Sequence, residues 1–226
     1  MMEPALVSLW AASTAFVGTH FALSHPLRSP LVKLLGDGGF AILYSLVAAA
    51  CMAWMYFAFV VAPAGGLGGS GEIGWIIASL LTLPALVLFL GSLMGNPALP
   101  VPGAEKLAQR EPAGVFAVTR HPMMWGFALW AFSHIVLWWS WRTLIVASAI
   151  LILALVGARL QDRKKARLMG GAWAEWEAKT SFRPRWTKLA SAGLILWLVA
   201  IAAWLGITWW HVQAGGIPAG LWRWIG

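Results

Sequence analysis

The stretch PMMWGFALWAFSHIVLWW, from Pro122 to Trp139, decides the architecture of this chain. It is long enough to cross a bilayer, because roughly 20 apolar residues rising about 1.5 Å each span about 30 Å of hydrocarbon. One ionisable residue, His134, lies inside it. A titratable side chain at that depth is costly, so it marks either a functional site or a hydrogen bond to a neighbouring helix. Neutral imidazole is also a good ligand for a metal ion or haem iron.

The whole chain has the composition of a multi-pass membrane protein. Apolar residues make up 60% of it, charged residues 11%, and the mean hydropathy is +0.75, whereas soluble domains carry roughly 25% charge. We therefore predict an all-α, polytopic membrane protein, with one integral membrane domain over residues 1–226 and about six transmembrane helices. The expected spans are about 4–23, 38–62, 73–95, 122–139, 143–160 and 189–211.

Basic residues gather on one side of this six-span arrangement. Segments 24–37, 96–121 and 159–188 share that side and hold 14 of the 16 Lys and Arg residues. Only Arg142 and Arg223 fall on the other side. The positive-inside rule places the basic side in the cytoplasm and both termini outside it. The charge is thus explained by topology, and we expect membrane lipids rather than nucleic acid as partners.

Two cytoplasmic segments interrupt the apolar pattern. Residues 96–121 are rich in proline, which blocks a continuous helix and predicts an ordered loop or short interfacial elements. Residues 161–185 begin as a charged continuation of the fifth span, which Gly170-Gly171 interrupts. The sequence AWAEWEAK then predicts a short amphipathic helix on the membrane surface. Its Trp173 and Trp176 would form an inner interfacial belt with Trp186.

The spacing of the histidines limits the kind of metal site that they can form. His121 and His134 share one helix at positions about 20 Å apart along its axis, so they cannot bind the same ion. No H-x-x-x-H, E-x-x-H or C-x-x-C motif is present, which leaves too few ligands for a zinc or di-iron site. A haem needs only one or two axial ligands, which here must come from different helices. The natural pair joins a first-span histidine to one in the fourth span; the five histidines are His20, His25, His121, His134 and His211.

Three stretches together resemble the NnrU family. They are GTHFALSHPLRSPLVKLLGDGGFAILYSLVAAA near the start, TRHPMMWGFALWAFSH, and ALVGARLQDRKKARLMGGAWAEWEAKTSF. The family includes bacterial proteins linked to nitrite and nitric oxide respiration, and plant 15-cis-zeta-carotene isomerases that hold b-type haem through histidine. The resemblance implies a b-type haem and matches the family histidines to His20 and His134. It also matches His121 to the histidine of the RHP motif.

This resemblance implies a protein of the bacterial inner membrane, so the termini that the positive-inside rule places outside the cytoplasm would be periplasmic. Its function would be that of an accessory or redox protein for denitrification enzymes, or of a haem-dependent isomerase acting on an apolar polyene. The ligand pair stays open, because His20 is expected near the cytoplasmic end of its span and His134 past the middle of its own. His121 is the alternative to His134. Arg120 is either a snorkelling anchor or a partner of an anionic group such as a haem propionate.

A second resemblance supplies a rival function. The RHP-x-x-x-G pattern, a crossing helix and a short Trp-rich helix are similar to isoprenylcysteine and phospholipid methyltransferases, which use S-adenosylmethionine. The matching residues are Arg120, His121, Pro122 and Gly126. However, Met124 replaces the expected aromatic residue, and a basic run replaces the expected acidic pair and leaves only Asp162. A basic run cannot accept hydrogen bonds from the cofactor. Methyl transfer is therefore kept as the alternative to the haem-binding function.

Overall fold

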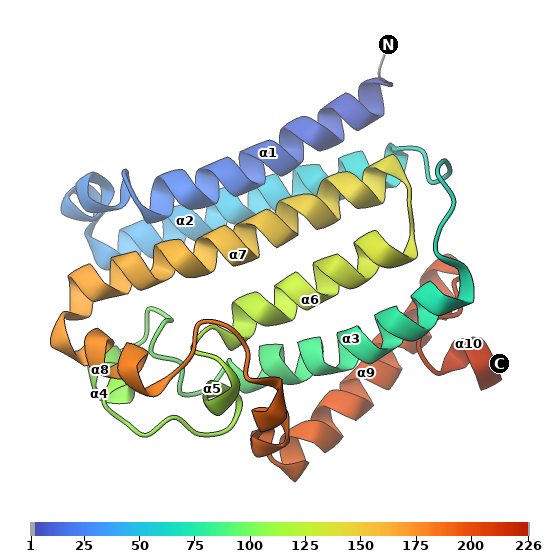
Figure 1. Cartoon of the computed structure of the whole chain (residues 1–226). Helices are drawn as coiled ribbons and strands as arrows, with labels where there is room; N and C mark the ends of the chain where they lie inside the picture. Colours follow the sequence, from blue (N-terminus) through green and yellow to red (C-terminus); the bar gives the residue numbers. More distant parts are fainter. Residues whose placement is uncertain (1–2, 226) are drawn as a thin grey trace. The chain divides into compact units, whose positions relative to one another are not determined.

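The computed structural model describes residues 3–225, which fold into helices joined by loops of varied length (Figure 1). Within this range there is no strand, only an isolated bridge between Gly69 and Trp138. The prediction of an all-α protein is therefore confirmed. The helices are α1 Pro4–Ser24, α2 Arg28–Val61, α3 Gly71–Gly91, α4 Ala104–Ala108, α5 Val115–Val118, α6 Pro122–Leu137, α7 Trp141–Met169, α8 Gly171–Lys179, the 3-10 helix η1 Trp186–Ala192, α9 Leu194–Gly215 and α10 Trp222–Ile225.

Five of the described helices, namely α1, α2, α3, α7 and α9, are long and apolar enough to cross a membrane. The predicted span 122–139 corresponds to α6, a shorter apolar helix of 16 residues. Helix α2 begins ten residues before the predicted span 38–62, but Gly36, with φ of +69°, interrupts its helical geometry. Only glycine adopts this conformation without strain, so the apolar helix proper follows Gly36.

Contacts divide the chain into two compact units. The first contains the residues up to Gly69 and Trp138–Leu153. In it α1 packs against α2 and the first part of α7, around Leu9, Ala12 and Phe16. The second contains Ser70–Leu137 and the residues from Ala154 onward.

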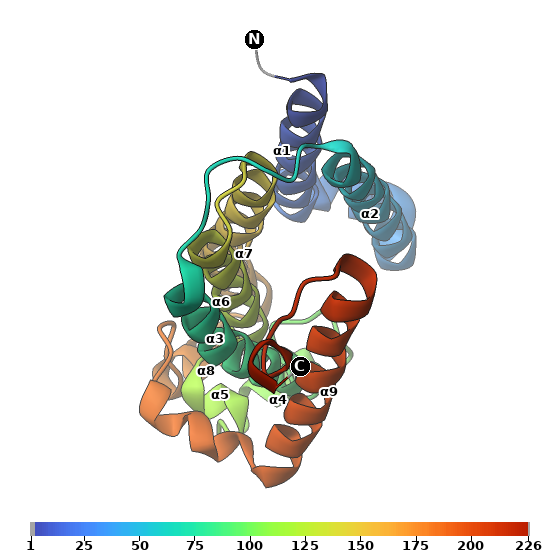
Figure 2. The ribbon, with the colours of Figure 1, turned by 90° about the vertical axis from the view of Figure 1, so that its right-hand side faces the viewer.

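In the second unit α3 packs against both α6 and α9 (Figures 1 and 2). The contact between α3 and α6 depends on Gly126. A Cβ atom there would lie 2.7 Å from the carbonyl oxygen of Ala85 and 3.3 Å from the backbone nitrogen of Phe89. The absent side chain therefore lets the two backbones approach closely, as small residues do between membrane helices.

Helix α8 forms where the sequence predicts it, but its tryptophans do not lie on the membrane surface. Trp173 is 0% exposed and Trp176 is 2% exposed, and both belong to a core that includes Leu88 and Val118. The predicted interfacial role of these two residues is therefore wrong. Burying two indole rings inside the protein removes more apolar surface from water than an interfacial position does. Trp186 remains 47% exposed, and its interfacial role stays a prediction.

Candidate functional site

A cluster of charged side chains in the second unit joins the start of α6 to α7 and α8. Pro122 opens α6, as its fixed φ predicts, and Arg120 and His121 precede it. Thr119 holds this segment in place, because its hydroxyl donates to the carbonyl oxygens of Ser181 and Phe182 at 3.1 and 2.9 Å. The backbone N–H of Arg120 also donates to Ser181 O at 2.9 Å. These hydrogen bonds hold the backbone from which the side chains of Arg120 and His121 extend.

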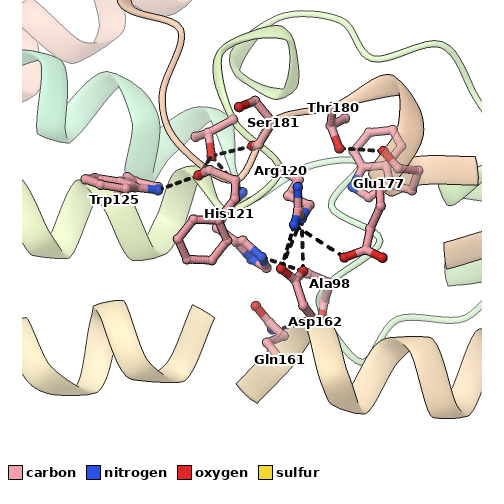
Figure 3. Close-up of polar contacts among 12 residues, drawn as sticks. Ala98, Arg120, His121, Trp125, Gln161, Asp162, Glu177, Thr180 and Ser181 are labelled. Atoms are coloured by element: carbon pink, nitrogen blue, oxygen red, sulfur yellow. Dashed lines mark hydrogen bonds and ion pairs between the residues drawn. The ribbon is translucent and has the colours of Figure 1, made fainter. Parts of the chain in front are cut away.

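Asp162 on α7 is the centre of this cluster, and Figure 3 shows Arg120 and His121 converging on it. Arg120 donates from Nε to both carboxylate oxygens at 3.0 and 3.1 Å, and from Nη2 to Oδ2 at 2.8 Å. The Nε2 of His121 donates to Oδ1 at 2.7 Å. A weaker contact of 3.3 Å joins Arg120 Nη2 to Glu177 on α8. The side chains of Arg120, His121 and Asp162 are only 12%, 0% and 14% exposed.

Asp162 lies in the charged stretch that follows the apolar segment 143–160. Burial on its own would raise the pKa of Asp162, but the hydrogen bonds from His121 and Arg120 outweigh it. These bonds favour the charged form and hold the pKa of Asp162 below its ordinary value. The cluster is therefore built around an ionised carboxylate.

This geometry changes the expected roles of Arg120 and His121. Arg120 is not a snorkelling anchor, because its guanidinium is buried and paired with Asp162. The guanidinium donors of Arg120 are therefore already used by the Asp162 carboxylate and are not available to a haem propionate. His121 uses Nε2 for Asp162, and its buried Nδ1 has no hydrogen-bond partner among residues 3–225. Neither nitrogen of His121 is therefore free and accessible to iron.

His20 lies on α1 in the first unit and is half-buried. Its Nδ1 lies 2.7 Å from the carbonyl oxygen of Phe16, one turn earlier. Its ring also meets the edge of Tyr44 on α2, at 5.4 Å between centroids. The hydroxyl of Ser24, one turn later, donates to the Tyr44 hydroxyl at 3.5 Å. Ser24 therefore helps to hold an aromatic neighbour of His20.

His134 lies on α6 in the second unit and is held in the same way. Its Nδ1 is 2.8 Å from the carbonyl oxygen of Trp130, and the two rings lie 4.3 Å apart. His211 on α9 repeats this arrangement with Ile207 O, also at 2.8 Å. When Nδ1 carries the proton and donates it to a carbonyl, Nε2 keeps the lone pair that a metal requires.

The residues described by the structure contain no group of three His, Cys, Asp or Glu side chains that could hold a metal ion. An ion with several protein ligands therefore has no site among them. Single histidines that present Nε2 from apolar helices match the smaller requirement of haem iron. The donor chemistry of His20 and His134 thus fits a haem, while that of His121 does not.

The partners of Asp162 are not visible in the sequence. There the carboxylate stands only as the remainder of an absent acidic pair, and nothing in the sequence marks Glu177. The signal available was a lone acidic residue in a basic run that follows a crossing helix, which suggests a specific cationic partner.

Comparison with known protein families gives one match over most of the chain. A family model described as NnrU protein matches residues 8–219. This range includes His20, His134 and the whole Arg120–His121–Asp162 cluster. Searches of curated proteins and of solved structures returned no match.

Proposed function

Because the chain belongs to the NnrU family, we propose that it is an integral membrane protein that binds b-type haem, for which His20 and His134 are the candidate ligands. One observation carries this proposal. Each of the two rings has its Nδ1 at hydrogen-bond distance from the carbonyl oxygen one turn earlier, at 2.7 and 2.8 Å. That contact fixes the tautomer in which Nε2 is the metal-binding atom and makes the nitrogen more basic.

The chain's own residues would set the properties of the bound group. The carbonyls of Phe16 and Trp130 orient the two imidazoles, and the apolar helices α1 and α6 that carry them would keep bulk water away in a membrane. Bound haem would supply a one-electron or Lewis-acid centre. His20 and His134 would hold the group, and its one-electron chemistry would serve electron transfer or sensing for denitrification enzymes in the bacterial inner membrane. Alternatively, the bound haem would serve the isomerisation of an apolar polyene.

The cluster of Arg120, His121 and Asp162 argues against methyl transfer. Asp162 and Glu177, the carboxylates nearest the RHP motif, are both paired with Arg120. Lys165 of the basic run is buried and donates to the carbonyl oxygens of Pro97 and Leu99 at 2.8 and 3.1 Å. The polar groups that would meet the ribose and amino groups of S-adenosylmethionine are therefore engaged within the protein.

The experiment is an absorption spectrum of the purified protein, oxidised and then reduced with dithionite. We expect a Soret band and sharp reduced α and β bands, with low-spin iron in the ferric state. His20→Ala and His134→Ala should each empty the site or leave high-spin iron. His25→Ala and His211→Ala should leave the spectrum unchanged.

His211 is the most informative control, because its ring is held like that of His134 and it belongs to the same unit. If low-spin haem is lost in His211→Ala but fully retained in His20→Ala, the second ligand is His211 on α9 and not His20 on α1. Haem that is lost only in His121→Ala would contradict both assignments. A wild-type protein without a Soret band after expression with excess haem would refute the cofactor itself.

A further inference from the structure

A cavity of about 450 Å³ lies within the second unit, between α6, the second part of α7 and the loop that follows α8. Leu155 and Val156 of α7 form its apolar wall, and Trp125, Phe182 and Trp186 supply aromatic surface. No histidine lines it, so it is separate from the proposed haem ligands. Its size falls in the range of small-molecule and lipid-headgroup sites.

The aromatic wall is held by specific contacts. The indole N–H of Trp125 donates to the carbonyl oxygen of Phe182 at 2.8 Å, which ties the loop to α6. The Trp125 ring also meets the rings of Phe182 and Trp186 edge to face, each at 6.5 Å between centroids. The loop is thus held against α6 through Trp125 and Phe182.

Two guanidinium groups, from Arg159 and Arg183, complete the cavity. Arg159 stacks 5.9 Å from the centre of the Phe182 ring. Among residues 3–225 neither arginine forms an ion pair with a carboxylate, whereas nearby Arg120 is neutralised by Asp162. The cavity therefore combines two positive charges that lack a negative partner with an apolar wall. A complementary ligand carries an anionic group joined to an apolar chain.

The place of the cavity along the chain identifies the source of such a ligand. Leu155 and Val156 belong to the last apolar turns of the predicted fifth span, and Arg159 opens the charged stretch that follows. Trp186, exposed and amphipathic, is typical of the membrane interface. We infer that this cavity binds an anionic phospholipid, whose phosphate contacts Arg159 and Arg183 while an acyl chain follows Leu155 and Val156.

The test measures binding of phosphatidylglycerol to the detergent-purified, lipid-depleted protein by native mass spectrometry and titration calorimetry. We expect saturable binding of one molecule, with much weaker binding of phosphatidylcholine. A basic residue near an anionic headgroup contributes roughly a five-fold effect, so Arg159→Gln and Arg183→Gln should each weaken binding about five-fold. Arg185→Gln, which removes an exposed arginine two residues away and outside the cavity lining, is the matched control and should change binding less than two-fold.

Several results would overturn the inference. Equal binding of phosphatidylcholine, unaffected by either arginine variant, would mean that the cavity has no anion preference. Displacement of the lipid by inorganic phosphate or S-adenosylmethionine at similar concentrations would assign it to a soluble ligand. A loss of haem absorbance in Arg159→Gln with unchanged lipid binding would make these arginines partners of haem propionates. The lipid measurement needs no haem, so failure of the proposed function leaves this test intact.

Discussion

Replacing Asp162 by Asn tests whether the buried charge cluster stabilises the second unit. The substitution keeps the shape of the side chain but removes the charge that Arg120 and His121 share. Breaking a buried ion pair by removing one partner costs 3–5 kcal/mol in typical cases. Arg120 retains the 3.3 Å contact to Glu177, so we expect the lower end, about 3 kcal/mol. The assay is unfolding of the detergent-solubilised protein by sodium dodecyl sulfate, followed by near-ultraviolet circular dichroism.

Asp37→Asn is the matched control, since it is the same substitution in an exposed pair. Asp37 is 82% exposed and lies 3.4 Å from Arg28, so its loss should cost less than about 1 kcal/mol. The double variant Arg120→Met, Asp162→Leu should be less destabilised than Asp162→Asn, because it leaves no unpaired buried charge of this pair. Equal losses of stability in Asp162→Asn and Asp37→Asn would refute the reasoning.

The pH dependence of the cluster has a defined sign. Because the folded protein holds the pKa of Asp162 below its ordinary value, the stabilisation is complete above about pH 4 and is lost as the pH falls through the lowered value. The difference in stability between wild type and Asp162→Asn should therefore shrink under strongly acidic conditions. A difference that grows on acidification would contradict this assignment.

Three further predictions concern packing, topology and cofactor choice. Gly126→Ala should lower the unfolding free energy by about 1–3 kcal/mol, because the new Cβ meets Ala85 O. Gly206→Ala, which has open space around its Cα, should not lower it. Equal effects of the two substitutions would exclude close packing as the cause. A reporter fused after the C-terminus should be active only on the periplasmic side, and one inserted near Ala108 only in the cytoplasm; the reverse pattern would overturn the six-span topology. S-adenosylmethionine should show no micromolar binding in a thermal-shift titration, and saturable binding that disappears in Arg120→Ala would restore the methyltransferase alternative.

The apolar runs alone determined that the chain is an all-helical membrane protein. Backbone groups in hydrocarbon must be paired within their own segment, so long apolar runs can only be helices there. Local signals also determined particular ends. Pro122 starts α6, and the glycine pair at 170–171 separates α7 from α8. These features depend on neighbouring residues and are therefore visible in the sequence.

Only the tertiary structure decided what the polar and aromatic residues outside the apolar runs contact. Arg120 and Asp162 are 42 residues apart, and Arg120 and Glu177 are 57 apart, so no periodicity records their pairing. Tryptophan is common at membrane interfaces, yet packing between α8 and its neighbours buries Trp173 completely. The physical reason is the same in each case, because burial and charge pairing depend on which distant segments meet, whereas helix formation depends on the local run.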